Sequence, residues 1–431
     1  MQRSILLAAA AACLTLAAAP AHAQDSTRGV RIGLTYQPGT KPGVVVLPIG
    51  GADGDSVQAI LQRDLDYGDR VDVLRETNAT ASAGSGTINY GVWKTFGAAA
   101  LVQVTLTQAG AHVAVHDVGA RRIAQVRDFP LPAAPESEQW RLAVHGISDE
   151  VERWITGVRG IAQTRVLYVR GGRVYVIDSD GYGERAVSES GTALSPAWHP
   201  SGRYIAYSQF GTRGTSIVVR DLASGQSRTL ATTPGGLNIT PTFSPDGNSI
   251  VYAHGEENGT DLYVASAFGG GAARRITVGR GTDNVSPSFS PDGSRLAFTS
   301  GRAGHPEVYT ADVDGSNVEL LTPFNFGDQN YRSNPDWSPD GRLIAFQSQI
   351  DGSFQIMTIT LRDRTVKQLT SEGVNEDASW APDGRHLVFT SSRTGVKQLF
   401  VLDAESGRTR QLTHGAGSRL AAWSRVLDHA P

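Results

Sequence analysis

Cysteine is almost absent from this chain. The single residue of this type, Cys13, lies in an apolar N-terminal segment, and residues 24–431 contain no thiol. This excludes disulfides, thiolate zinc sites and cysteine nucleophiles from that part of the chain. Its stability therefore has to come from packed area and hydrogen bonds.

Long apolar runs are also lacking, apart from residues 5–19. This run follows Arg3 and precedes Ala21, His22 and Ala23, the small-x-small pattern of a signal peptidase site. It is shorter than the roughly 20 residues that a membrane-spanning helix needs. We therefore expect a secretory signal in residues 1–23, cleaved after Ala23, and a periplasmic mature protein.

Neither a strong charge excess nor a catalytic motif is present. The formal net charge is -3, and loss of Arg3 with the signal makes the mature chain slightly more negative, which disfavours nucleic acid and anionic lipid as main partners. The chain has no H-E-x-x-H, G-x-S-x-G or P-loop motif, and its histidines lack metal-ligand spacing. We therefore predict no catalytic residue, no metal site and no cofactor.

A repeated motif fills the C-terminal two-thirds of the chain. The unit is a small residue, Pro, any residue and an aromatic, followed by x-Pro-Asp-Gly, with copies at residues 195–202, 240–247, 286–293, 334–341 and 377–384 and a short sixth copy at 422–424. The aromatic residues recur every 43 to 48 positions. A period of this length is typical of a β-propeller.

The Ser-Pro-Asp-Gly segment has the chemistry of a turn between antiparallel strands. It supplies a hydroxyl at the first position, a ring with a preset φ at the second, and a Gly that can adopt positive φ at the exit. Alternating strands follow it at residues 204–208, 249–253, 296–300, 343–348 and 387–391. Charged outer strands, such as residues 274–277 and 410–413, suit a solvated sheet edge.

The two ends of the repeat region predict how the ring closes. Three strand-like segments, residues 166–169, 174–177 and 185–187, precede the first repeat, whereas a lone segment, residues 420–424, follows the last one. Three strands from the front and one from the back complete a sixth blade and remove the open sheet edges. The predicted fold is thus an α/β N-terminal domain followed by an all-β six-bladed β-propeller closed by a 3+1 strand seam.

We expect the N-terminal α/β domain to occupy residues 24–160 and the propeller to occupy residues 161–431. The α/β pattern comprises strands at 44–49 and 71–74, helices at 56–65 and 89–96, and a hairpin at 101–107 and 112–117. A final helix over residues 135–155 carries a regular apolar stripe and ends before Gly157.

Two pairs of residues allow a chemical interpretation. Asp178 and Asp180, with Gly181, resemble part of a calcium loop, as do residues 312–315, but no bidentate Glu follows and a plain turn explains both better. His145 and Asp149 stand four residues apart on the final helix, where an acid–base pair is one interpretation. A surface or interdomain hydrogen bond fits this pair better.

The chain resembles the TolB family of the Tol-Pal envelope system over nearly the whole mature sequence. Beyond the repeats, the similarity rests on residues 145–150, 156–160 and 164–169, which look like the family's interdomain helix and first propeller strand, and on residues 42–49 and 92–98. Residues 24–28 and 65–70 depart from the family's pattern. The resemblance implies a non-catalytic protein that supports outer-membrane integrity and cell division.

It further implies binding of the lipoprotein Pal at the mouth of the propeller, with the mature N-terminal segment able to engage TolA. In the family the Pal face is formed by loops that enter each inner strand. The matching positions here are Asn238, Ile239, Thr282, Asp283, Asn284, Val285, Gln329, Asn330, Tyr331, Arg332, Asn375, Glu376 and Asp377. Their polar content with one aromatic residue is typical of a protein-binding surface.

Two other classes of function stay open at this point. A propeller hydrolase or lyase would act in the central channel, and metal analysis would reveal channel-borne metal chemistry. A generic periplasmic scaffold would share the architecture and bind another partner.

Overall fold

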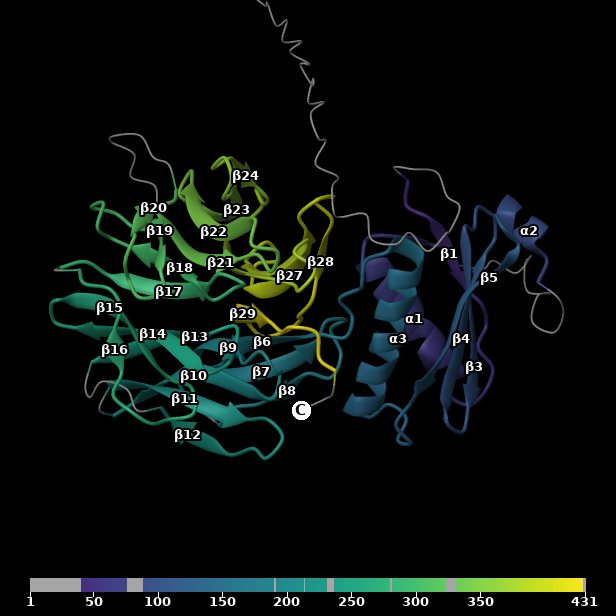
Figure 1. Cartoon of the computed structure of the whole chain (residues 1–431), viewed down its shortest axis with the longest axis horizontal. Coiled ribbons are helices and arrows are strands. Elements are labelled where there is room, and N and C mark those ends of the chain that lie inside the picture. The colour runs from purple at the N-terminus through teal and green to yellow at the C-terminus, as the bar shows by residue number, and fades with distance from the viewer. Residues whose placement is uncertain are drawn as a thin grey trace, which may run out of the picture.

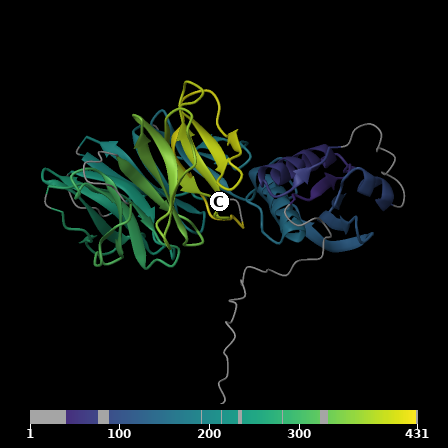
Figure 2. The ribbon, with the colours of Figure 1, turned by 90° about the horizontal axis from the view of Figure 1, so that it is seen from above.

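The structure is a computed structural model that describes residues 40–75, 88–189, 191–212, 214–230, 236–279, 281–322 and 331–428. The predicted signal and residues 24–28 lie outside these ranges. Figure 1 shows two bodies side by side, a smaller one that contains helices and a larger one built from strands. The view from above in Figure 2 shows the same division.

The smaller body is a five-stranded sheet in the order β2-β1-β3-β4-β5. Its strands are β1 (Gly43–Val46), β2 (Asp72–Val73), β3 (Ala100–Thr107), β4 (Gly110–Asp117) and β5 (Arg122–Pro130). β1 is parallel to both neighbours, and the remaining pairs are antiparallel. The sequence pattern missed β5, because this edge strand is mostly exposed and lacks an alternating apolar face.

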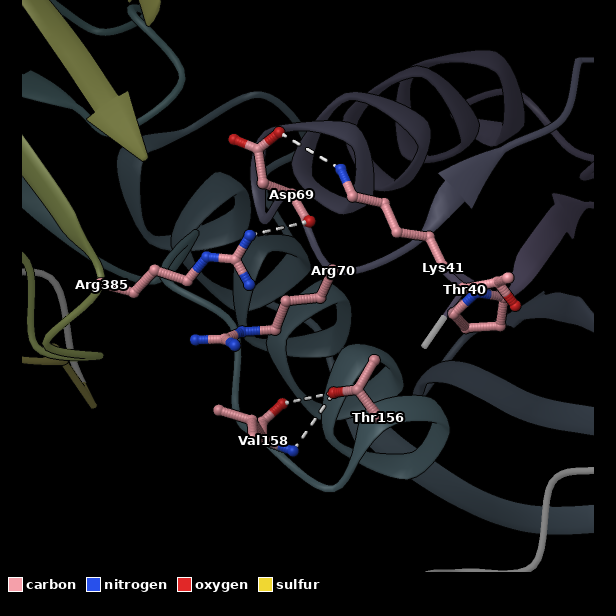
Figure 3. Close-up of a pocket in the computed structure, with 8 residues that line it drawn as sticks. Thr40, Lys41, Asp69, Arg70, Thr156, Val158 and Arg385 are labelled. Atoms are coloured by element: carbon pink, nitrogen blue, oxygen red, sulfur yellow. Dashed lines mark hydrogen bonds and ion pairs between the residues drawn. The ribbon is translucent and has the colours of Figure 1, made fainter. Parts of the chain in front are cut away.

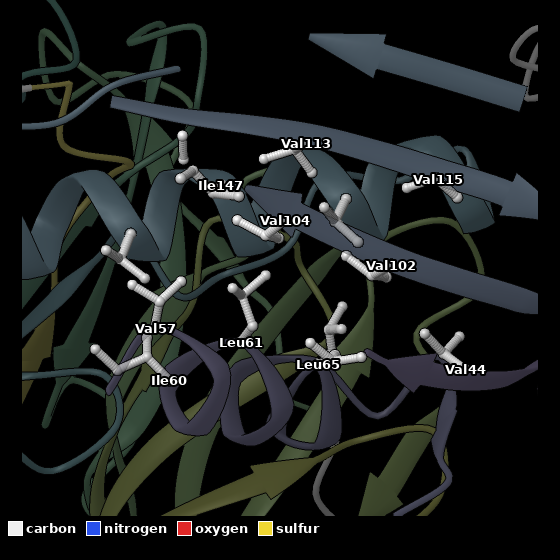
Figure 4. Packing of buried hydrophobic residues seen from close by; sticks show 14 of the residues in the cluster. Val44, Val57, Ile60, Leu61, Leu65, Val102, Val104, Val113, Val115 and Ile147 are labelled. Atoms are coloured by element: carbon white, nitrogen blue, oxygen red, sulfur yellow. The ribbon is translucent and has the colours of Figure 1, made fainter. Parts of the chain in front are cut away.

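Two helices cover one face of this sheet, α1 (Gly54–Tyr67) and α3 (Glu138–Thr156). Figure 4 shows Leu61 and Leu65 of α1 and Ile147 of α3 packing against valines of β3 and β4. A short helix, α2 (Tyr90–Thr95), buries Trp93 against the other face. In Figure 1, α1 and α3 lie between the sheet and the larger body, so their outer faces form the domain interface.

Helix α3 ends as the sequence predicts. Gly157 adopts φ 84° and its N–H donates to the Arg153 carbonyl, as expected for a left-handed helix stop. The start differs slightly from the prediction, because the Ser137 side chain caps the helix by accepting from the Trp140 N–H at 3.3 Å. None of the helices in the described part of the chain has the length and apolar content that crossing a bilayer demands.

The larger body is a six-bladed propeller of four-stranded antiparallel sheets. Five blades follow one another in the chain. Blade 1 is β9 (Ala193–Trp198), β10 (Tyr204–Gly211), β11 (Gly214–Asp221) and β12 (Ser227–Thr229); blade 2 is β13 (Leu237–Phe243), β14 (Ser249–Glu256), β15 (Gly259–Ser266) and β16 (Arg274–Arg275); blade 3 is β17 (Asn284–Phe289), β18 (Arg295–Ser300), β19 (Glu307–Asp312) and β20 (Glu319–Leu320); blade 4 is β21 (Arg332–Trp337), β22 (Leu343–Ile350), β23 (Ser353–Thr360) and β24 (Val366–Gln368); blade 5 is β25 (Asn375–Trp380), β26 (His386–Ser391), β27 (Gln398–Asp403) and β28 (Thr409–Gln411).

Blade 6 confirms the predicted seam. It combines the inner strand β29 (Arg419–Trp423) with β6 (Arg165–Arg170), β7 (Arg173–Asp178) and β8 (Arg185–Ala186). Trp423 pairs with Val166, and the Trp423 indole donates to the Thr164 hydroxyl at 2.8 Å. The last strand, β29, thus closes the ring by pairing with β6, the first strand of the propeller.

The repeated turns also adopt the predicted conformation. Gly247 of the Ser-Pro-Asp-Gly turn in blade 2 has φ 77°, and equivalent glycines in the other blades are also left-handed. The Ser244 hydroxyl accepts from the Ser249 N–H at 3.0 Å, which fixes the strand that follows. Six apolar clusters lie between neighbouring blades, so each blade depends on both neighbours for its burial.

Candidate partner-binding site

Each inner strand carries the same local irregularity near the propeller axis. The register to the second strand shifts within it, at a residue with positive φ. These residues are Ser195, Thr240, Ser286, Asn334, Asp377 and Leu420, with φ between 49° and 57°. The six bulges surround an axial cavity of about 300 Å³. The wall of the cavity is therefore set by the small-Pro-x-aromatic repeat itself.

Hydrogen bonds link this wall from blade to blade. The Ser286 hydroxyl donates to the Asn334 side-chain carbonyl at 2.8 Å, and the Asn334 amide donates to the Asp377 carboxylate at 2.8 Å. A second carboxyl, Asp336, accepts from the Trp380 N–H at 2.8 Å. Burial raises the pKa of both carboxyls to about 6, and for Asp377 the nearby charge of Glu376 adds to the effect.

The loops and strand starts at one end of the propeller hold the predicted partner-binding residues. We call this end the rim; it comprises the loops that lead into the inner strands and the turns that join second and third strands. Gln329 and Asn330 lie outside the described residues. The other eleven predicted residues all lie on or beside the inner strands of blades 2 to 5, and Asp377 also lines the axial cavity.

Three predicted contact residues turn out to be buried. Asn238, Asn284 and Asn375 are 2%, 0% and 0% exposed. Each donates to the start of the third strand in the preceding blade: to the Thr215 carbonyl, to the Thr260 carbonyl and to the Gln355 side chain, respectively. A partner cannot reach these asparagines directly, so the expectation of direct contact is corrected for them. They brace one blade against the next and hold the rim loops in place.

Arg332 occupies the equivalent position in blade 4. Its guanidinium donates to Glu307 at 2.9 Å, and Glu307 is fully buried in blade 3. At this position of the inner strand, an asparagine amide links the blade to the preceding one in blades 2, 3 and 5, whereas an ion pair makes the link in blade 4. Sequence reasoning missed this bracing role because a polar residue at the start of a strand has the same appearance whether it faces solvent or the neighbouring blade.

Six predicted residues stay accessible at the rim. They are Ile239, Thr282, Asp283, Val285, Tyr331 and Glu376, all partly or fully exposed. Tyr331 is 41% exposed and its ring packs edge-on against Phe354 at 5.5 Å. Glu376 forms an ion pair with Lys397. An anchored aromatic ring beside polar groups is the composition that protein-binding surfaces favour.

Exposed apolar residues that the sequence reading did not select lie at the same end. Val278 is 75% exposed, Val396 is 49% exposed and Phe210 is 43% exposed. A groove of about 870 Å³ extends the rim outward along blade 2 and the loop that leads from it into blade 3, with Asp261, Tyr263 and Asp283 among its lining residues. Single apolar residues in turns, loops or strand ends give no periodic signal, which is why the sequence did not reveal them.

The N-terminal domain contacts the other end of the propeller. Its partners there are the turn before β26, which contains Asp383, the turn before β8, which contains Asp180, and the turn before β28, which leads to Arg408. These turns join first to second and third to fourth strands, at the blade ends opposite to the rim. The described part of the N-terminal domain therefore leaves the rim accessible.

The two chemical pairs considered from the sequence belong to this domain interface. Asp180 forms ion pairs with Arg63 and Arg141 of the N-terminal domain, so its turn is an interdomain contact and not a calcium loop. His145 is buried beside Asp64, with 2.7 Å between ring nitrogen and carboxylate. Asp149 instead accepts from the Ala162 and Gln163 N–H groups of the linker. His145 and Asp149 thus have separate partners and form no acid–base pair.

Comparison with known proteins agrees with this architecture. The family described as TolB beta propeller domain matches residues 152–427, which is more than half of the chain. The chain belongs to the TolB family. The matched residues include all six blades of the propeller.

Individual relatives support the assignment. The Tol-Pal system protein TolB of Thioalkalivibrio sulfidiphilus is 36% identical over 160 residues, 34% of this chain and 36% of that protein. The protein of the same name from Methylococcus capsulatus is 32% identical over 206 residues, 44% of this chain and 48% of that protein. These matches thus span less than half of each relative. The crystal structure of TolB from Acinetobacter baumannii covers 90% of this chain and 97% of its own, with a TM-score of 0.78 at 25% identity.

Proposed function

We propose that this chain is a periplasmic, non-catalytic component of a Tol-Pal system, and that its rim binds a Pal-like lipoprotein. The proposal is supported by its membership of the TolB family and by relatives named Tol-Pal system protein TolB. The observation that carries it is the rim itself. Exposed apolar and polar side chains gather there on loops braced by buried asparagines, and the described N-terminal domain contacts the opposite end.

Rigid bracing favours binding because loops that are already ordered lose less conformational entropy on association. Tyr331 is the best anchor, since exposed tyrosines near the centre of an interface often dominate its energy. Asp283, Glu376 and the accessible residues around them would then surround this anchor with polar contacts. A TolA-like protein is the proposed second partner, through the mature N-terminal segment.

The test is binding of the mature chain to the Pal-like lipoprotein of its own organism, measured by calorimetry. We expect Tyr331→Ala to weaken binding by about tenfold or more. Phe268→Ala is the matched control, because Phe268 is an exposed, ring-packed aromatic at the other end of the strands and should leave affinity unchanged. Failure of the unmodified chain to bind the lipoprotein would refute the proposal. A parallel measurement with a TolA-like protein, before and after removal of residues 24–28, tests the second partner.

A further inference from the structure

A carboxylate of the propeller is inserted into the N-terminal domain. Asp180 is almost fully buried and pairs with Arg141 at 2.7 Å and with Arg63. The His145 ring nitrogen lies 3.8 Å from the same carboxylate, and the opposite ring nitrogen lies 2.7 Å from Asp64. We call this arrangement of Arg63, Arg141 and His145 around Asp180 the first socket.

The reverse arrangement occurs a short distance along the interface. Asp69 of the N-terminal domain pairs with Arg408 at 2.8 Å and with the His386 ring at 3.4 Å, both from the propeller. Figure 3 shows Lys41 approaching the same carboxylate, and Arg385 donating to the Asp69 carbonyl. We call this the second socket. Each domain thus offers one acid to a cationic site, containing a histidine, on the other.

A third buried carboxyl, Glu152 of α3, lies between the domains. It is 2% exposed, and Arg70, 3.4 Å away, links it across the interface to Asp383. Glycines surround it: a Cβ added at Gly68 or Gly160 would come within 2.2 or 2.8 Å of its carboxylate. The backbone of the N-terminal domain therefore passes close to this acid at two points where a side chain would not fit.

Metal ions are a poor explanation for these acids and histidines. Asp64, His145 and Asp180, and likewise Asp69, His386 and Asp403, are close enough to hold an ion. In both clusters, however, guanidinium groups already compensate the carboxylates: Arg63 and Arg141 in the first, Arg385 and Arg408 in the second. A divalent cation would have to approach these positive charges at close range. Protons are the better candidate ligands.

We propose that the two sockets and Glu152 form a pH-sensitive lock between the domains, closed in mildly acidic solution and loosened in mildly alkaline solution. This goes beyond the proposed binding function and does not depend on it. The lock controls how firmly the N-terminal domain is held against the end of the propeller opposite to the rim.

The first socket loosens when His145 loses its proton. Burial alone would lower the pKa of His145, but the carboxylates of Asp64, Asp180 and Asp178 outweigh it and raise the pKa to about 9. Arg63 and Arg141 are the facing cations, and they remain after His145 has become neutral. Asp64 then loses its positively charged partner, and Asp180 keeps only two of its three, Arg63 and Arg141.

Glu152 opposes closure when it becomes charged. Burial and the charge of Asp149 raise its pKa to about 8, with Asp383 acting in the same direction and Arg70 and His386 against it. Burial also raises the pKa of Asp149 to about 7, although the linker N–H groups lower it. Deprotonation adds negative charge to an interface that already holds several carboxylates.

The direction of the pH effect follows from proton binding. His145, Glu152 and Asp149 all have folded pKa values above their ordinary values of 6.5, 4.5 and 3.8. The native state binds their protons more tightly, so their contribution to the stability of the closed form is complete below these ordinary values. It is lost as the pH rises through the raised pKa values, which are about 7 for Asp149, about 8 for Glu152 and about 9 for His145. Asp69 and Asp180 have lowered pKa values, so they stabilise the closed form above 3.8 and fail only in stronger acid.

The test measures the distance between the domains. Because residues 24–431 lack cysteine, Ala109→Cys in the N-terminal domain and Ala223→Cys in the propeller place two spin labels at exposed turns. We expect one narrow distance distribution at pH 6 and a broader, longer one above about pH 8, reversible on acidification. An unchanged distribution from pH 6 to 9.5 would overturn the proposal.

Variants identify the groups responsible. Glu152→Gln stays neutral at every pH and should move the opening midpoint to higher pH, because the charge that opposes closure no longer forms. His145→Gln should keep the domains apart already at pH 6. If the His145 variant fails to fold, the Glu152 variant alone still decides the test. His112→Gln is the control, because His112 is exposed and pairs with Asp128 away from the interface; it should not alter the curve. Opening caused by a chelator at pH 6 would show bound metal and contradict the proposal.

Discussion

The two ends of the propeller, the rim and the end that contacts the N-terminal domain, are held together by different kinds of polar contact. At the rim, buried asparagine amides brace three blades and the Arg332–Glu307 ion pair braces a fourth, while apolar and polar side chains stay exposed. At the domain interface, the polar groups are charged, buried and paired across domains. Neutral hydrogen bonds are insensitive to pH and salt, whereas buried ion pairs depend on the protonation of every member. The bracing at the rim therefore depends less on protonation than the domain interface does.

Removing the seam, the pairing of β29 with β6, should unfold the propeller, so that the rim and the domain interface are lost together. This is the largest expected effect. A chain that lacks residues 419–431 has no inner strand in blade 6, so β6 and the inner strand of blade 1 lose their neighbour. We expect loss of the cooperative thermal transition and of native near-UV circular dichroism. A chain that ends at Asp428 keeps the bond from the Leu427 N–H to the Gln163 carbonyl and should fold. A folded propeller in the shorter chain would disprove the structural role of the seam.

Asp180→Ala should damage only the interface. It leaves Arg63, Arg141 and His145 together without their shared carboxylate, and removal of one partner from a buried ion pair costs about 3 to 5 kcal/mol. Denaturant unfolding should show this loss, while affinity at the rim stays unchanged. Asp314→Ala, in the equivalent turn of blade 3 but hydrogen-bonded locally to Ser316, is the matched control and should have little effect. Equal destabilisation by both variants would contradict an interdomain role for Asp180.

Asn284→Ala should have a smaller effect, confined to the rim. It removes the hydrogen bonds to the Thr260 carbonyl and the Asp261 carboxylate and an acceptor for Arg302. A buried polar group left without its partner costs about 1 to 3 kcal/mol. Partner affinity should fall although Asn284 is inaccessible, because the loop with Thr282 and Asp283 loses its brace. Asn258→Ala, at the tip of the neighbouring turn, provides the comparison; unchanged affinity in the Asn284 variant would show that the brace is dispensable.

The propeller could be predicted almost completely from the sequence, because each blade repeats the same turn and the same aromatic position. The 3+1 closure followed from strand counts at the two ends. Strand β5 was missed because its side chains, such as Ile123 and Val126, are exposed at an edge and follow no burial period.

The candidate site was only partly predictable. Sequence position placed the selected residues together at one end of the blades, but it could not separate buried Asn284 from exposed Asp283, its neighbour. Of the interface, only an interdomain role for the helix around His145 was predicted, since Asp69, Asp180 and His386 are far apart in sequence and meet only through tertiary packing. A lone Asp in a turn has the same local appearance whether it faces solvent or a cationic socket.

The seam also has a consequence for the order of folding. Val166 and Trp423 pair across more than half of the chain, and Ser424 and Leu427 donate backbone hydrogen bonds to Arg165 and Gln163 in and next to the interdomain linker. Contacts of such long range form slowly, because the intervening chain must first be brought together. The N-terminal domain and blades 1 to 5 are made earlier, yet the ring cannot close until the final strand arrives. Until then β6 has a free edge beside the linker, where it can pair with another chain.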